Sequence, residues 1–309
     1  MKKFVVNILI FFAIVLTIDF TVGFFGDYLT CHVRSGDTKR TYDLSMKDCH
    51  DVLILGSSRA RHHYDAPFLS DTLGLDVYNA GYDGNGIVLA YGLLEMILER
   101  YQPKLILYDV EPAFDVNYYE PDNNHKRYIT RLKPYYHHKA VGNIIEDVSS
   151  EEWYKVHSGM VRYNMSLLTM YLDNFRPNID SRKGYSPLYG EYDREPDSNG
   201  EENDLDHFKL RYIEKIITLA NSRHVPIVFV ASPKYGKTSS DDIKPVIDIC
   251  KNNDVVFLDF YSDTKFMQHK DWFKEPMHLN EKGAKEFSSI LAKNISEFIS
   301  MTTIITKNH

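Results

Sequence analysis

The chain has 309 residues, of which 43% are hydrophobic and 26% are charged, and its net charge is −7. This length fits one large domain or a domain with an appendage, and the composition allows a normal packed core. The negative charge and the lack of a block rich in lysine and arginine exclude a typical nucleic-acid-binding protein.

The N-terminus is strongly apolar. Two lysines precede a run from Phe4 to Ile18 whose one polar residue is Asn7, and the apolar character continues past Asp19 to Phe25. About 20 residues span a bilayer as a helix, so residues 1–27 are expected to form a transmembrane signal anchor. A cleaved signal peptide is the rival, but no small-x-small cleavage site follows. A buried core helix would keep one polar face.

The lysines before this run predict the orientation of the chain. Positive residues favour the cytoplasmic side, so we expect a single-pass protein of the cytoplasmic (inner) membrane with its body outside the cytoplasm. Residues 28–50 are expected to be a polar, irregular juxtamembrane linker. Cys31 and Cys49 could pair there in an oxidising compartment, and the alternative is that they and Cys250 are three unrelated thiols. No Cys/His cluster indicates a metal, and no cofactor is expected.

Short apolar runs alternate with segments of helical periodicity in the rest of the chain. The expected strands are residues 51–56, 75–79, 104–110, 226–231 and 255–260, and the expected helices are residues 65–73, 86–101, 205–223, 241–252 and 280–300. This alternation predicts an α/β fold, a three-layer α/β/α sandwich with a five-stranded parallel sheet in the order 2-1-3-4-5. Its domain would cover residues 51–300.

The regular alternation stops between about residues 112 and 204. This stretch is rich in Tyr, Asp, Asn and Pro and is read as an insertion into the α/β domain. Helices are expected within residues 150–175 and a loose acidic loop at residues 190–203.

The first strand runs directly into Gly56-Ser57-Ser58-Arg59. Sites in such sheets form at the carboxyl ends of the strands, so this turn is expected at the mouth of a site. A serine nucleophile needs a base, an orienting group for that base and donors for the oxyanion. His278 comes just before the last helix, and Glu275 lies three residues earlier. The competing interpretation is that His278 only begins a helix beside a surface glutamate.

Backbone donors for an oxyanion would come from Ser58 and from a glycine-rich turn. After the second expected strand the chain reads NAGYDGNGI, with glycines at 81, 84 and 86. Glycines let backbone N–H groups approach a ligand closely, although most glycines at strand–helix junctions are structural.

Together, these motifs resemble the SGNH/GDSL hydrolase family over residues 51–111 and 205–299. The resemblance implies an α/β/α fold, Ser58 as nucleophile, Gly84 as oxyanion donor, and Glu275 with His278 as the acidic residue and base. Ser57 replaces the usual aspartate of the first motif, and Glu275 replaces the usual aspartate of the last.

The third family motif departs further. The family usually carries an asparagine that donates to the oxyanion after the third strand, where this chain has Asp109 and Glu111. An ionised carboxylate cannot donate a hydrogen bond and would repel an oxyanion. Arg59 is expected either to pair with one of these carboxylates or to bind an anionic substrate group, and the ion pair is favoured. His62 and His63 are read as loop or helix-start residues.

Three functions remain open on the sequence. The first is a membrane-anchored serine esterase or deacetylase that acts on acylated carbohydrate or related esters, where tyrosines of the insertion could stack on sugar rings. The second is an O-acyltransferase of cell-envelope polysaccharide with the same residues. The third is a non-catalytic scaffold on a degenerate hydrolase fold, because fold alone does not give function.

Overall fold

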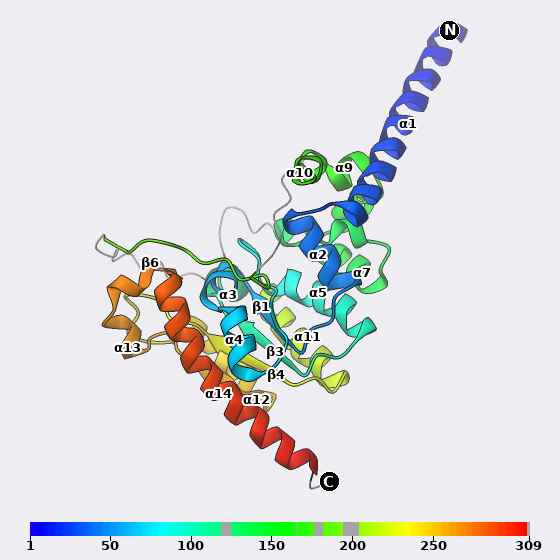
Figure 1. Cartoon of the computed structure of the whole chain (residues 1–309). Helices are drawn as coiled ribbons and strands as arrows, with labels where there is room; N and C mark the ends of the chain where they lie inside the picture. The colour runs from blue at the N-terminus through cyan, green and yellow to red at the C-terminus, as the bar shows by residue number, and fades with distance from the viewer. Residues whose placement is uncertain (119–124, 165, 176–181, 194–203, 308–309) are drawn as a thin grey trace. The chain divides into compact units, whose positions relative to one another are not determined.

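The computed structural model describes residues 1–118, 125–164, 166–175, 182–193 and 204–307 (Figure 1). The chain divides into two compact units. The helical unit comprises Met1–Asp48, Gly92–Arg100 and Asn124–Ile179, and the sheet unit comprises Cys49–Tyr91, Tyr101–Asn123 and Asp180–His309. Helix α5 (Ile87–Arg100) contributes to both.

The sheet unit is built on a five-stranded parallel sheet with the order β2-β1-β3-β4-β5, which confirms the predicted fold class and strand order. The strands are β1 (Val52–Gly56), β2 (Val77–Asn79), β3 (Leu105–Asp109), β4 (Ile227–Ala231) and β5 (Phe257–Asp259). All residues of the three central strands β1, β3 and β4 are buried, as expected for strands with helices on both faces. The register pairs Gly56 with Asp109, so the first turn and the end of β3 are neighbours.

Alternating residues of the central strands divide between two cores. Val52, Leu107 and Val230 face one core, which includes Leu69 of α4 (Ala66–Leu73) and Phe287 of α14 (Glu281–Lys307). Tyr108 and Phe229 lie in contact on the other face, with ring centroids 5.3 Å apart. The remaining helices of this unit with at least four residues are α3 (Ser58–His63), α6 (Pro112–Asp115), α11 (His207–Ser222), α12 (Lys244–Asn252) and α13 (Thr264–Met267).

Two short strands, β6 (Phe273–Glu275) and β7 (His278–Leu279), form an antiparallel hairpin just before α14. The sequence did not predict this hairpin, because two- and three-residue strands leave no periodicity to detect. The Asn280 side chain accepts a hydrogen bond from Gly283 N at 3.0 Å and so caps α14.

The helical unit begins with α1 (Lys2–His32), whose N-terminal half extends away from the other helices of its unit (Figure 1). It is long and apolar enough to cross a membrane. The other helices of the unit with at least five residues are α2 (Gly36–Met46), η1 (His125–Ile129), α7 (Lys139–Val148), α8 (Ser150–Lys155), α9 (Gly159–Tyr163) and α10 (Ser166–Asp173). Helices α8, α9 and α10 occupy the range in which helices were expected.

The structure corrects the expectation for residues 28–50. They are mostly helical, because α1 continues to His32 and α2 follows after the Ser35 N-cap. The polar composition of residues 28–50 did not indicate α2, in which Lys39 and Asp43 form an ion pair one turn apart. Cys31, Cys49 and Cys250 are all free thiols, so the structure does not contain the Cys31–Cys49 disulfide. Most of the expected acidic loop, residues 194–203, lies outside the described residues.

Candidate active site

The turn after β1 places Ser58 at the start of a helix. Gly56 has a φ of +140°, and a Cβ at this position would lie 2.7 Å from the carbonyl oxygen of Asp109, so the close approach of β3 requires glycine. Ser57 is the N-cap of α3, and its buried hydroxyl accepts a hydrogen bond from Arg59 N at 3.3 Å. Ser58 is the first helical residue and remains partly exposed. Of the two serines, Ser58 is therefore the one a substrate could reach.

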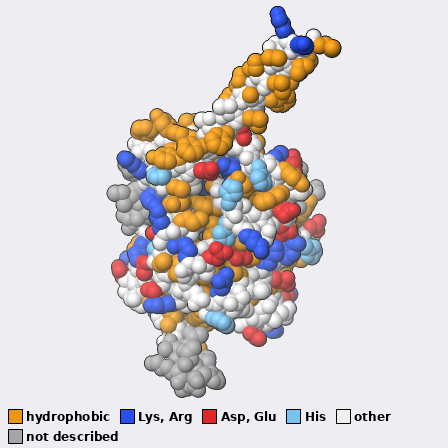
Figure 2. Space-filling view, turned by 90° about the vertical axis from the view of Figure 1, so that its right-hand side faces the viewer, with side chains coloured by type: hydrophobic (Ala, Val, Ile, Leu, Met, Phe, Trp, Pro, Cys, Tyr) orange, Lys and Arg blue, Asp and Glu red, His pale blue; other side chains and the backbone are white. Residues whose placement is uncertain are grey.

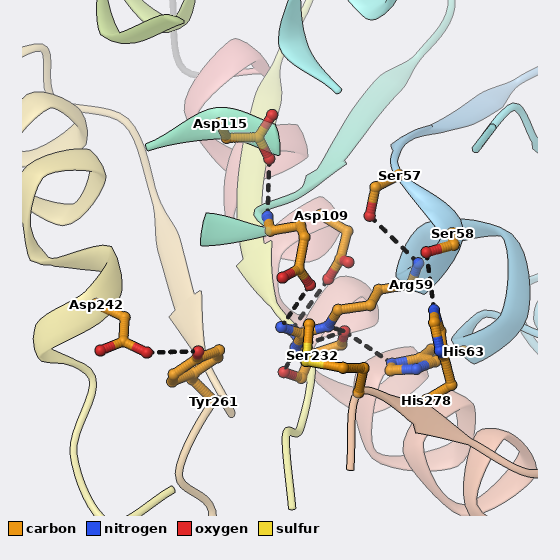
Figure 3. A network of polar contacts seen from close by, with 12 residues as sticks. Ser57, Ser58, Arg59, His63, Asp109, Asp115, Ser232, Asp242, Tyr261 and His278 are labelled. Carbon is orange, nitrogen blue, oxygen red and sulfur yellow. Dashed lines mark hydrogen bonds and ion pairs between the residues drawn. The ribbon is translucent and has the colours of Figure 1, made fainter. Parts of the chain in front are cut away.

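His278 and Glu275 reach this turn from the β6–β7 hairpin, in which they are paired residues. The His278 Nε2 atom lies 2.8 Å from the Ser58 hydroxyl oxygen (Figure 3). The other ring nitrogen, Nδ1, is hydrogen-bonded to Glu275 Oε1. If Nδ1 carries the proton, Nε2 is an acceptor facing the serine hydroxyl, which is the arrangement a general base needs.

Glu275 is held in its ionised form although the residue is about half-buried. Burial acts to raise its pKa, but the hydrogen bond and charge of His278 outweigh burial and lower the pKa below its usual value. The Met277 N–H adds a hydrogen bond of 3.3 Å to the second carboxylate oxygen. Glu275 can thus orient His278 and stabilise an imidazolium.

Arg59 points the opposite way from Ser58, into the interior. Its side chain is fully buried, and Nη1 lies 3.1 Å from Glu111 Oε2. Nε donates to the Ser232 hydroxyl at 3.2 Å, Nη2 donates to the Ser232 carbonyl oxygen, and the guanidinium lies 5.2 Å from the Tyr261 ring centre. The structure therefore contains the ion pair favoured by the sequence, and no part of the Arg59 side chain is exposed to contact a substrate.

Two further carboxylates, Asp109 at the end of β3 and Asp115 in α6, also make hydrogen bonds that hold the structure together. Asp109 Oδ1 accepts hydrogen bonds from the Tyr64 hydroxyl and, at 3.0 Å, from Ser232 N. Asp115 accepts from the backbone N–H of Glu111 and from the Tyr108 hydroxyl, each at 2.7 Å. Burial raises the pKa of Asp115 to about 7, although these hydrogen bonds act in the opposite direction. Asp115 thereby fixes the backbone that carries Glu111.

His63 links the β6–β7 hairpin to Ser232 through its two ring nitrogens. Its Nε2 accepts the backbone N–H of Leu279 at 2.9 Å, which leaves Nδ1 to donate to the Ser232 hydroxyl, also at 2.9 Å. Burial, together with the charge of Arg59, lowers the pKa of His63 well below its usual value, so this ring is neutral. The rings of His62 and His63 stand edge-on to the His278 ring, with centroids 5.4 and 6.0 Å away. Both residues belong to α3, and neither contacts Ser58 as a base.

Gly84 lies in an exposed turn with a φ of +67°, after β2. The preceding residue, Asp83, ties this turn to α3 through Arg61 Nη1 at 3.0 Å and His62 Nε2 at 3.2 Å. Within the described part of the chain, the backbone N–H groups of Ser58 and Gly84 donate to no protein atom. Gly81 packs more tightly on the turn after β1, but Asn79 Oδ1 already accepts its N–H.

Sequence reasoning missed Ser232, which links Arg59, His63 and Asp109 and follows β4 directly (Figure 3). Its place at the carboxyl end of a central strand was the available signal. It also missed the contacts of His63, for which the signal was weak because a histidine pair on a short helix has no fixed partner. Among the described residues no group of three or more His, Cys, Asp and Glu side chains could hold a metal ion.

Comparison with known proteins gives only distant structural likenesses. No family model and no curated protein matches the chain. The structure is similar to a gut microbial diltiazem-metabolizing enzyme, BT4096, with a TM-score of 0.39 and 13% identity over 78% of this chain and 46% of that one. It is also similar to the acetyl xylan esterase AlAXEase, with a TM-score of 0.38 and 11% identity over 80% of this chain and 99% of that one. This chain thus spans about half the length of the first enzyme.

Proposed function

We propose that this protein is a membrane-anchored serine esterase of the SGNH type, with Ser58, His278 and Glu275 as its catalytic triad. The observation that carries the proposal is the continuous chain of hydrogen bonds from the Ser58 hydroxyl through His278 to Glu275. These residues lie 220 and 3 positions apart in sequence, yet each supplies one of the parts that an activated serine requires.

In the proposed reaction the Ser58 oxygen attacks the ester carbonyl carbon while its proton passes to His278 Nε2. The tetrahedral intermediate collapses, the bond to the alcohol oxygen breaks, and His278 returns the proton to the departing alcohol. Water then attacks the acyl-serine, gives a proton to His278 and releases the carboxylic acid, and the proton returns to Ser58. The Nδ1 proton stays on His278 throughout and is hydrogen-bonded to Glu275.

The N–H groups of Ser58 and Gly84 are the proposed oxyanion donors. Glu111 is not expected to repel an oxyanion bound by these donors, because its charge is paired with Arg59 inside the protein and its side chain is almost fully buried. Glu111 does not replace the family's asparagine as a donor, and loss of one such donor typically lowers the rate by about 10²–10³-fold. We therefore expect a slow enzyme.

The proposed substrate is an acylated glycan. Two aromatic rings next to the triad support this choice. Tyr235 N donates to the carbonyl of Pro276, which lies between Glu275 and His278, and the Tyr235 ring packs edge-on against Tyr192 at 5.9 Å. Both tyrosines are partly exposed, and such rings offer apolar faces for sugar rings together with hydroxyl groups. Helix α1 is proposed to anchor the enzyme in the cytoplasmic membrane with the site outside.

The test is labelling of the full-length protein in detergent with a fluorophosphonate probe. Labelling should disappear in Ser58→Ala and His278→Ala and persist in Ser57→Ala, because only Ser58 meets the base. A folded wild-type protein that stays unlabelled beside an active control hydrolase would overturn the proposal. Release of acetate from acetylated oligosaccharides by labelling-competent protein would then test the substrate class.

A further inference from the structure

We propose that α9 and α10 form a platform that lies in the membrane interface beside α1, so that the helical unit is partly immersed in lipid. The platform is defined by Gly159–Tyr163 and Ser166–Asp173, with Phe175 just beyond. The inference rests on the part of the proposed function in which α1 spans the membrane, and its partner is the lipid surface itself.

The first observation is the position along α1 at which α9 begins to contact it. A hydrocarbon core of about 30 Å requires about 20 helical residues, which from Phe4 extends to Gly23. Yet α9 meets α1 already at Asp19: the Asp19 carboxylate accepts hydrogen bonds from Ser158 Oγ at 2.5 Å, Met160 N at 2.9 Å and Gly159 N at 3.2 Å. The last turn of the span therefore lies beside the start of α9.

Close packing fixes α9 at this depth. A Cβ on Gly23 would lie 3.3 Å from Gly159 Cα, and a Cβ on Gly159 would collide with the backbone of Gly23. One turn further along α1, Asp27 accepts hydrogen bonds from the Tyr163 hydroxyl at 2.5 Å and from Arg162 Nη2 at 3.1 Å. Small residues that allow helix backbones to approach, and polar side chains that join helices, are typical of packing within membranes.

The second observation is that α10 is apolar on two faces. Met170 is buried with Leu29 and Val33 in a small core against α1. Most outward-facing residues of α9, of α10 and just beyond α10 are nevertheless apolar, with Thr169 as an exposed polar exception. Their exposed fractions lie between 40% and 67%: Met160, Val161, Leu168, Tyr171, Leu172 and Phe175. Apolar surface on a second face of a helix is unfavourable in water and is normally covered by protein or by lipid.

The platform continues an apolar surface that begins on the anchor itself. Phe20, Phe24 and Phe25 of α1 are more than half exposed, and in Figure 2 hydrophobic side chains extend from the projecting helix onto the surface at its base. Scattered apolar side chains are normal on a soluble protein, whereas a contiguous patch marks an interaction surface. Because this patch is continuous with the candidate membrane span, lipid is the occupant that the structure favours.

The experiment uses the full-length protein in nanodiscs, with Cys31→Ser and Cys49→Ser as background and an environment-sensitive fluorophore on single cysteines. Leu168→Cys and Tyr171→Cys probe the platform, Phe11→Cys probes the centre of α1, and Glu146→Cys, on the exposed face of α7, is the water-facing control. Nitroxide lipids that carry the quencher near the headgroup or deep in the acyl chain report depth.

We expect blue-shifted emission at both platform sites with strong quenching by the shallow nitroxide, and quenching of Phe11→Cys by the deep one. Platform probes that emit as Glu146→Cys does, while Phe11→Cys is still quenched, would overturn the inference and leave the anchor intact; a protein partner would then be the occupant. Loss of quenching at Phe11→Cys as well would overturn both the anchor and the platform. A detergent-solubilised sample with unchanged circular dichroism excludes misfolding of the variants.

Discussion

The two units of the molecule differ in where they place polar and apolar side chains. The sheet unit buries a cluster of ionisable groups, Arg59, Glu111, Asp109 and Asp115, which hydrogen-bond to one another or to nearby polar groups, although Asp109 Oδ2 and Glu111 Oε1 have no partner among the described residues. The helical unit exposes hydrophobic surface on α1, α9 and α10. Burial of charge is costly unless the charge is paired, and exposure of apolar surface to water is also unfavourable.

The contrast indicates which environment suits each unit. Buried, mutually bonded polar groups hold the base of a site rigid, as Ser232 does for Arg59 and His63. Exposed apolar helices gain stability only where water is excluded, which is the situation at a membrane. The sheet unit is therefore the candidate for chemistry and the helical unit the candidate for location. Four substitutions test this division, in order of decreasing expected effect.

The largest effect is expected at the proposed triad of Ser58, His278 and Glu275. Glu275→Gln keeps the shape of the side chain but presents an amide where a carboxylate accepts the Nδ1 proton, so the His278 tautomer that serves as a base is lost. We expect kcat for ester hydrolysis to fall by about 10⁴-fold, as in other serine triads. Glu286→Gln, at an exposed ion pair with Lys265 on the same unit, is the matched control. Equal rates in the two variants would contradict the role of Glu275.

The buried ion pair should dominate the stability of the sheet unit. Arg59→Met leaves Glu111 charged and unpaired in the interior, which typically costs about 3–5 kcal/mol. The double variant Arg59→Met/Glu111→Leu removes both charges and should recover much of that loss. Denaturant unfolding of the full-length chain in detergent measures both free energies. Lys244→Met, which breaks an exposed pair with Asp248, should change stability by less than about 0.5 kcal/mol.

If the double variant is no more stable than Arg59→Met, the charge of Glu111 is not what makes the single variant unstable. The interior would then depend on the hydrogen bonds of Arg59 to Ser232, and the contrast between buried charge and exposed apolar surface would need revision.

The pH dependence of stability reports on His63. Its pKa in the folded protein is well below the usual value of about 6.5, so below pH ~6.5 the unfolded chain binds a proton that the folded chain does not. Stability should thus fall as the pH drops below about 6.5, by up to about 1.4 kcal/mol per pH unit from this residue. His63→Gln can still accept the Leu279 N–H and should flatten that slope.

Asp115 contributes with the opposite sign. Its pKa is raised to about 7, so between roughly pH 4 and 7 the folded chain holds a proton that the unfolded chain releases, and stability rises as the pH falls. The difference between wild type and His63→Gln isolates the histidine because Asp115 is present in both. Parallel curves for the two proteins over this range would show that His63 does not titrate as the buried site requires.

The smallest effect belongs to the helical unit. Ser158 caps α9 by accepting from Val161 N at 3.3 Å and also donates to Asp19, whereas Ser149 caps α8 without an α1 contact. We expect Ser158→Ala to lower the free energy of unfolding of the full-length chain by about 1 kcal/mol and Ser149→Ala to lower it by less. Thermal unfolding of each variant in nanodiscs measures the difference. A larger loss at Ser149 would show that the Asp19 contact does not hold α9 to α1.

The parallel sheet could be predicted from the amino-acid sequence alone. Strand order and the position of the Gly-Ser-Ser turn at the end of β1 follow from continuous apolar runs and from residues that are neighbours in sequence. The apolar N-terminal helix was equally predictable, because a long run of apolar residues without charges is typical of a helix that can span a bilayer.

The contacts between polar groups could be seen only in the folded chain. In the folded chain Arg59 points inward to Glu111, and Ser232 lies between Arg59 and His63. Ser58 lies within hydrogen-bond distance of His278. The structure also shows that α9 binds Asp19 and that residues 28–50 are mostly helical. These features depend on contacts between segments more than 30 positions apart or on packing that outweighs local propensity, and a periodic pattern records neither.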